Sequence, residues 1–461
     1  MVRCLAGYLI HSLIAYIEEV NRLYPITMSV SSTAKGGLTF WEKADLLPAG
    51  LGIVFHIPIT LARGMWKARE LGVKRYKRYI VFEVMKRVFT RLSLKQFSYI
   101  NPSTSQAYES VCKQRGFKPE FEILSDGTTR AFWIGKKGAK SLVLNFHGGG
   151  YALAASPEMV EFMFRIVEGA ERNGEGCLAV LFLEYDLTPH ATYPRQLEQA
   201  AMLLDHALYT LKYIFLSFFL SRSFDVSSSS LEPIIESTFT LTEITRYPPS
   251  AINLTGDSAG ANLVLALLSH ILHPELSPLS SSQPQNPPSS SSGKPPLPLP
   301  LPSPLNSALL IAPWLTFSTS SPTFLSNKET DILDTQVLQK WSTAFVGDGK
   351  GSGKGNGGEA FLEPMKADGL WWKGLKGVVK EGILVVAGAE EAFVGDVREW
   401  VGSMRERLRS EGEDEGTGEW LRLVVAEGEY HDQPSIGIGL NDEVEDGGQT
   451  RAVKEWIWGK C

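Results

Sequence analysis

One short string in this chain has the residue types and spacing of an activated nucleophile. GDSAG at 256–260 closes an apolar run at 251–254 and opens a helix-like run at 262–272. A serine raised on a tight turn from strand to helix needs glycines beside it, because the turn brings the backbone close to itself. The turn also aims the N–H of Ala259 toward an oxygen held near Ser258. The pattern predicts Ser258 as a nucleophile, although a solvated turn uses the same residue types.

A glycine-rich loop supplies a second chemical feature. HGGG at 147–150 follows the strand-like segment 141–146 and precedes the apolar residues 151–154. The N–H groups of Gly149 and Gly150 are suited to hold a developing oxyanion together with that of Ala259. A phosphate cradle would also use such glycines, but no Gly-Lys-Ser/Thr follows. The loop therefore favours acyl transfer, and Tyr151 is expected to contribute to the substrate pocket.

These two motifs, in this order, resemble the hormone-sensitive-lipase-like branch of the α/β-hydrolases. The segment LEYDLTPHATYPRQLEQA at 183–200 is similar to the Tyr- and Pro-containing segment of that branch, and most resembles fungal esterases, including those related to steryl acetyl hydrolase. Asp186 departs from the pattern, since many relatives carry arginine there, and we expect it to change only local ion pairs. The resemblance implies an α/β-hydrolase fold, with a mostly parallel eight-stranded sheet flanked by helices and an N-terminal helical cap.

A serine hydroxyl needs a neighbouring base to accept its proton. The apolar run 421–426 is typical of the last strand of such a sheet, and HDQP at 431–434 follows it. The string resembles the family's histidine-aspartate-x-proline signature, which predicts His431 as the base. For the histidines in apolar or helical stretches, and for His147 in the glycine loop, a structural role is expected.

Three carboxylates compete to orient that base. Glu390, Glu391 and Asp396 all follow the predicted strand 383–387. The family's acid-x-leucine-x-aspartate pattern places Glu391 at the acid, although Gly395 replaces the downstream aspartate. Glu391 is therefore the first choice. Glu390 and Asp396 remain alternatives, and Asp396 also has a helix-capping explanation.

Hydrophobic periodicity predicts the elements that position these residues. Alternating strands and helices favour a largely parallel sheet, whose carboxyl edge would gather Ser258, Glu391 and His431. Strands are predicted at 120–124, 130–134, 141–146, 177–184, 251–254, 307–312, 383–387 and 421–426, and helices at 157–172, 194–211, 259–272, 396–409 and 452–458.

The remaining segments are predicted to cover or interrupt this core. Residues 1–35 are expected to form an extension or anchor, 36–118 a helical cap, and 119–461 the hydrolase core, with insertions at 212–245, 276–304 and 347–358. The insertion at 212–245 is either a lid or an artefact of the sequence.

Apolar N-terminal segments at 4–17 and 46–62, with a later one at 213–219, leave membrane contact open as an alternative. The 17 residues of 46–62 are marginal for a membrane span, and an apolar cap surface or substrate channel is favoured.

Composition agrees with an enzyme but does not choose its substrate. The 461 residues are 43% hydrophobic, and the net charge of −6 gives no nucleic-acid footprint. Four scattered cysteines lack metal-site spacing, and the chemistry needs no cofactor. We predict a serine carboxylic ester hydrolase, acting on short-acyl esters or as a deacetylase, with a small-molecule ester as partner. The small residues after the glycine loop, Ala152, Ala154 and Ala155, would permit a short acyl group.

Two alternatives stay open. One is an amide or formamide hydrolase on the same triad, and the other is a non-catalytic ligand receptor of the same fold. A cytoplasmic or endoplasmic-reticulum-associated location is expected. The sequence does not indicate an oligomeric state.

Overall fold

The computed structural model describes most of the chain between residues 37 and 460. The described ranges are 37–174, 176–208, 251–279, 301, 304–347, 358–367, 370–410, 417–442 and 447–460. The predicted segments 1–35, 4–17, 212–245 and 213–219 lie outside the described residues, as do most of 276–304 and 347–358.

An eight-stranded sheet organises the described residues, in the order β1-β2-β4-β3-β5-β6-β7-β8. β1 pairs antiparallel with β2, and β2 antiparallel with β4, whereas all later pairs are parallel. The strands are β1 Phe121–Ile123, β2 Arg130–Gly135, β3 Ser141–Phe146, β4 Leu178–Glu184, β5 Ala251–Asp257, β6 Ser307–Ile311, β7 Ile383–Gly388 and β8 Leu421–Ala426.

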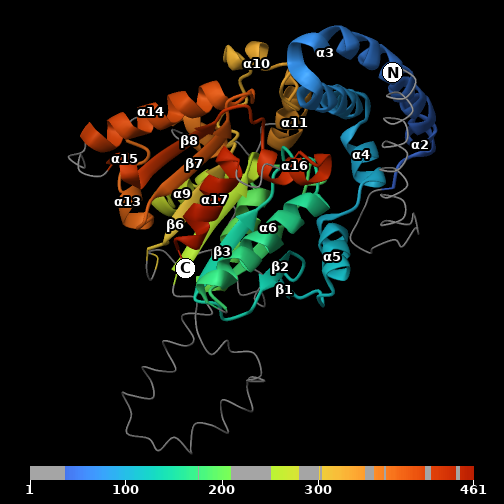
Figure 1. The fold of residues 1–461 in the computed structure, drawn as a ribbon. Helices are drawn as coiled ribbons and strands as arrows, with labels where there is room; N and C mark the ends of the chain where they lie inside the picture. Colours follow the sequence, from blue (N-terminus) through green and yellow to red (C-terminus); the bar gives the residue numbers. More distant parts are fainter. Residues whose placement is uncertain are drawn as a thin grey trace, which may run out of the picture.

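Helices cover both faces of this sheet. Figure 1 shows α6 and α17 on one face and α9 on the other. The described helices are α2 Phe40–Ala44, α3 Leu46–Arg91, α4 Leu94–Ile100, α5 Thr104–Arg115, α6 Pro157–Ala170, α9 Ala259–Leu272, α10 Thr323–Ser326, α11 Thr335–Val346, α12 Gly358–Leu362, α13 Leu375–Val378, α14 Val394–Ser410, α15 Thr417–Trp420, α16 Gln433–Leu440 and α17 Gly448–Trp458, with 3-10 turns η1 Glu171–Asn173 and η4 Pro364–Lys366. Residues 195–208 are also helical.

The core forms as two layers because successive strand residues point to opposite faces. In β3, Val143 packs in the layer that contains α6 and α17, while Leu144 packs in the layer that contains α9 and α14. Leu309 and Leu310 of β6 divide in the same way. Every residue of β3, β6 and β7 is buried, as expected for central parallel strands with helices on both faces.

Helix α3 is sharply bent. Along a straight helix, Gly64 and Ile80 would lie about 24 Å apart. Instead, a Cβ built on Gly64 would lie 2.8 Å from the Ile80 side chain and 2.7 Å from the Tyr76 ring. At the other end, Arg91 Nη1 donates to Asp45 Oδ2 at 3.0 Å. The helix therefore folds back on itself.

We call residues 46–65 the first arm of α3 and residues 76–91 its second arm. The contacts above make the two arms antiparallel, and α3 arches at the end of the sheet where α10, α11 and α16 lie (Figure 1). The second arm packs on the core, since Phe82 is fully buried beside Tyr430.

The predicted α/β architecture, with a mostly parallel eight-stranded sheet and an N-terminal helical region, is confirmed. The strands at 141–146 and 421–426 and the helix at 259–272 have the predicted bounds. The main difference is β5, which continues three residues beyond the prediction to Asp257 and so delivers Ser258 directly onto the turn.

Candidate active site

Ser258 lies at the sharp turn between β5 and α9. Its backbone has φ 52° and ψ −114°, a conformation that side-chain-bearing residues rarely adopt. A Cβ on Gly256 would collide with the carbonyl group of Gly260, and one on Gly260 would collide with the Phe146 carbonyl. Both glycines of the motif are therefore required by close backbone approach.

The neighbouring strand holds this turn in place. The Ser258 N–H donates to the Ile311 carbonyl at 2.8 Å, and the Trp314 N–H donates to the Ser258 carbonyl at 3.1 Å. Ile311 ends β6, so backbone hydrogen bonds hold the turn in place. The Ser258 hydroxyl takes no part in these bonds. Ser258 is 7% exposed.

Three N–H groups near this turn are available to a ligand. Within the described part of the chain, no hydrogen bond uses the N–H of Gly149, Gly150 or Ala259. Gly149 and Gly150 have φ of 102° and 60°, which explains the choice of glycine in the loop. The sequence predicted these three groups as oxyanion donors, and all three are unoccupied donors here.

Aromatic side chains support the glycine loop from behind. A Cβ on Gly150 would collide with the Trp341 ring of α11. Tyr151 stacks on Phe345 with ring centroids 3.8 Å apart, and its hydroxyl donates to Asn262 Oδ1 at 2.7 Å. Tyr151 is fully buried, so the structure gives it internal partners, and the predicted contact with substrate stays a prediction.

The small residues predicted to widen the acyl site are only partly available. Ala152 and Ala155 are 2% and 1% exposed and pack into the protein, whereas Ala154 is half-buried. The small size of Ala152 and Ala155 allows this close packing.

The structure brings His431 and Glu391 together from different loops. Nδ1 of His431 lies 3.8 Å from Oε1 of Glu391, too long for a hydrogen bond, and neither atom has a hydrogen-bond partner. The other Glu391 oxygen accepts from the Gly388 N–H at 2.8 Å. Both side chains are buried, and Phe393 meets the His431 ring edge-on. Glu391 is therefore positioned to orient the imidazole.

The two alternative acids are engaged elsewhere. Oε2 of Glu390 lies 3.4 Å from Nη1 of Arg78, on the second arm of α3. Asp396 lies in the first turn of α14, where burial raises its pKa to about 6 against the opposing effect of Ser321.

Arg78 also reaches the loop that carries the base. Its Nη1 donates to the Gly428 carbonyl of that loop at 3.2 Å, and its Nε donates to Oδ2 of Asp442, which lies beyond α16, at 3.2 Å. The N-terminal helical region thus contacts both the acid loop and the base loop.

A fourth carboxylate, Asp331, joins these loops and was not predicted. Oδ1 accepts from the N–H groups of Ile332 at 2.8 Å and His431 at 3.2 Å, and Oδ2 accepts from the Ala392 N–H at 2.7 Å. Asp331 is fully buried, between α10 and α11. Its carboxylate links the acid loop to the backbone of the base. No sequence signal predicts this role, because Asp331 belongs to no motif.

The buried carboxylates set the electrostatics of the base. Burial alone would lower the pKa of His431, but the charge of Glu391, assisted by those of Asp331 and Asp432, raises it to about 9. Burial in turn raises the pKa of Glu391, and His431 opposes that effect. The site therefore favours the protonated imidazole, the form that follows proton uptake from a serine.

A second pair of acids connects the nucleophile turn to the base loop. Asp257 is buried next to Gly148, where a Cβ would collide with its carboxyl group. Burial and the charge of Asp432 raise the pKa of Asp257 well above its usual value. Burial also raises the pKa of Asp432 to about 6, with Ser435 opposing. The protonation of Asp257 therefore depends on that of Asp432, and the reverse.

His147 has a structural place in this arrangement. Its ring is buried and stacks on Tyr185 with centroids 4.2 Å apart, and burial lowers its pKa to about 4. The Tyr185 hydroxyl donates to the His147 carbonyl at 2.6 Å. These contacts fix the start of the glycine loop from the segment that follows β4.

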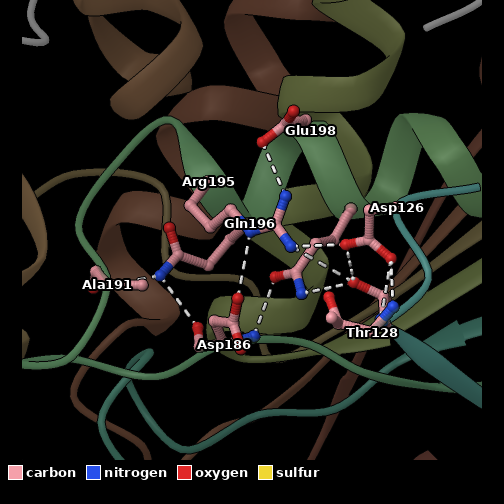
Figure 2. A network of polar contacts seen from close by, with 9 residues as sticks. Asp126, Thr128, Asp186, Ala191, Arg195, Gln196 and Glu198 are labelled. Atoms are coloured by element: carbon pink, nitrogen blue, oxygen red, sulfur yellow. Dashed lines mark hydrogen bonds and ion pairs between the residues drawn. The ribbon is translucent and has the colours of Figure 1, made fainter. Parts of the chain in front are cut away.

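That segment is held by a polar network, shown in Figure 2. Nε of Arg195 donates to Asp186 at 3.0 Å, and Nη1 donates to Glu198 at 2.8 Å. Nη2 of the same side chain contacts Asp126 at 2.5 Å, in the hairpin between β1 and β2. Asp186 thus takes part in a local ion-pair network, in line with the effect expected from its departure.

Across the residues that the structure describes, no three His, Cys, Asp or Glu side chains are arranged to hold a metal ion.

Comparison with known proteins gives a family and a fold. The family model described as alpha/beta hydrolase fold matches residues 143–412. No curated protein matches the chain. The solved structure of a thermostable esterase from Pseudomonas putida ECU1011 is similar at 16% identity and a TM-score of 0.52, covering 83% of this chain and 94% of that one.

Two further solved structures are similar. A mutant of esterase rPPE complexed with (S)-Ac-CPA has 15% identity and a TM-score of 0.51, covering 83% of this chain and 94% of the other. Carboxyl esterase 2 from the mycorrhizal fungus Tuber melanosporum has 16% identity and a TM-score of 0.47, covering 74% and 86%.

Proposed function

The chain belongs to the alpha/beta hydrolase fold family, and from its site we propose that it is a serine hydrolase of short-acyl carboxylic esters. The observations that carry this proposal are Ser258 on its strained turn and the facing pair of His431 and Glu391. Asp257, the residue before Ser258, interacts electrostatically with His431 and Asp432 of the base loop. The three uncommitted N–H groups of Gly149, Gly150 and Ala259 complete the set.

In the proposed first step, Ser258 Oγ attacks the ester carbonyl carbon while His431 accepts the hydroxyl proton. Glu391 orients the ring and stabilises the imidazolium, which the raised pKa of His431 favours. The N–H groups of the glycine loop and of Ala259 stabilise the oxyanion. His431 then gives its proton to the departing alcohol, and the acyl group stays on Ser258.

In the proposed second step, a water molecule attacks the acyl carbon and gives a proton to His431. The carboxylic acid leaves, and the proton returns to Ser258. No atom of the enzyme is consumed. The preference for short acyl groups rests on the resemblance of the HGGG and GDSAG motifs to those of hormone-sensitive-lipase-like esterases.

The test is hydrolysis of p-nitrophenyl acetate, butyrate and octanoate by the protein and by its Ser258→Ala variant. We expect the substitution to lower kcat by at least about 10³-fold, since it removes the nucleophile. The acetate and butyrate should be cleaved with higher kcat/KM than the octanoate. Equal rates in both proteins would overturn the proposal, and Ser258-dependent cleavage of p-nitroacetanilide with no ester turnover would assign an amidase instead.

A further inference from the structure

The first arm of α3 carries a continuous apolar surface. Its exposed side chains recur at helical spacing from residue 47 to residue 59, and Met65 follows on the same helix face. We call this face the outer stripe, and each member is 48% to 72% exposed: Leu47, Leu51, Val54, Phe55, Ile59 and Met65. At helix rise it is about 27 Å long. Pro48, Gly50, Pro58 and Ala62 are exposed beside it and add no charge.

The composition of this arm is unusual for a surface helix. Residues 46–62 contain no Asp, Glu, Lys or Arg. The most apolar 18 consecutive residues within Phe40–Met65 have a mean hydropathy of 1.5, and 11% of them are buried. Single exposed apolar residues are ordinary on proteins, but a contiguous stripe of this length marks a surface with a partner.

The charge that follows the stripe indicates which partner. Between residues 63 and 77 the chain has six Lys or Arg and one Glu, so this 15-residue stretch has a net charge of +5 in a protein whose total is −6. A basic segment directly after an apolar helix face fits the anionic headgroups and acyl boundary of a lipid bilayer. A docking site for a second protein would not require a basic segment directly after the apolar helix face.

The opposite face of the arm limits how it meets lipid. Ala49, Thr60 and Gly64 are buried, and Gly64 packs on Tyr76 and Ile80 of the second arm. A helix that crossed the bilayer would have to leave these contacts. We propose that the outer stripe lies in the plane of an anionic membrane surface, which also attracts the positive charge that follows the stripe in the sequence.

This docking would place the candidate active site close to the bilayer. The second arm, which packs against the first, carries Phe82 beside Tyr430, the residue before His431. A lipophilic ester dissolved in the membrane would then have a short path to the site. The docking itself does not rest on ester hydrolysis.

Vesicle flotation tests the proposal with the full chain. Vesicles of phosphatidylcholine, with and without phosphatidylserine, are mixed with the protein and separated on a density gradient. The test variant carries Leu51→Glu, Phe55→Glu and Ile59→Glu. The matched control carries Leu276→Glu, Leu325→Glu and Leu370→Glu, at three exposed leucines outside the stripe. Circular dichroism and thermal unfolding check that both remain folded.

We expect the wild type and the control to float with phosphatidylserine vesicles, and added salt to weaken that binding. The stripe variant should bind at least about 100-fold more weakly, because three apolar side chains that the bilayer would bury become charged. Alkaline carbonate should release the wild type from the vesicles.

Several results would overturn the proposal: no flotation of the wild type, equal flotation of the stripe variant, resistance to carbonate, or lipid-free self-association that the stripe variant abolishes. The Ser258→Ala variant should float like the wild type. Flotation without esterase activity would therefore contradict the proposed function and leave the docking supported.

Discussion

Two helical segments of this protein are apolar along their length, and their surroundings are opposite. Helix α9, which begins after Ser258, is buried from Ala259 to Ile271, between the sheet and the helices α12 and α13. The first arm of α3 leaves its outer stripe in solvent. Both segments are therefore predicted as apolar helices from the sequence. Whether such a helix is buried or exposed depends on the elements that pack against it.

The largest difference between the two segments should appear when a glycine in each becomes alanine. Gly260→Ala would drive a methyl group into the Phe146 carbonyl, and we expect loss of folded protein or of nearly all activity. The methyl group of Gly50→Ala, beside the outer stripe, meets nothing within 4 Å, and the substitution should stabilise the protein by about 0.5–1 kcal/mol. Thermal unfolding and p-nitrophenyl acetate turnover measure both. Equal effects of the two substitutions on stability and turnover would contradict the difference in burial between α9 and the first arm of α3.

A smaller effect should separate the two adjacent glutamates. Glu391→Gln keeps the shape but removes the charge facing His431, and we expect kcat to fall by about 10²- to 10⁴-fold. Glu390→Gln affects a side chain paired with Arg78 and should lower kcat by less than about tenfold. Steady-state kinetics with equal amounts of folded protein decide the matter. A larger loss in the Glu390 variant would reassign the acid.

The smallest effect concerns pH. The base must be neutral to accept the Ser258 proton, so kcat/KM falls as pH drops through the pKa of His431. Because that pKa is raised, the acidic limb of the profile should lie above pH 6.5. Asp331→Asn removes one negative charge and should move the limb to lower pH, with a stability loss of about 1–3 kcal/mol from the altered bonds. If the acidic limb of the Asp331→Asn profile stays at the wild-type pH, Asp331 acts by positioning His431 and not through its charge.

Much of the fold could be predicted because its signals are local. Apolar runs gave the strands at 141–146 and 421–426, and GDSAG placed Ser258 at a turn that only small neighbours allow. Motif position singled out Glu391 and His431, which the structure brings together.

Features that depend on distant contacts could not be predicted. Asp331 lies in a loop with no motif, and its role appears only where the acid and base loops meet it. The bend of α3 depends on Gly64 meeting Ile80, which are 16 positions apart, and periodicity alone describes one long helix. The contacts of Tyr151 with Asn262 and Phe345 also could not be predicted, because these partners are distant in the sequence; its contact with substrate stays a prediction.

Through Arg78, the N-terminal helical region contacts the loops of the candidate site and does more than cover it. One guanidinium contacts Glu390 of the acid loop, Gly428 of the base loop and Asp442 beyond α16. It belongs to the second arm of α3, which packs on the buried face of the first arm. A shortened chain beginning after residue 90 would keep Ser258, His431 and Glu391 but would lose these three contacts of Arg78. The proposed catalytic residues would then all be present without the contacts that hold their loops in position.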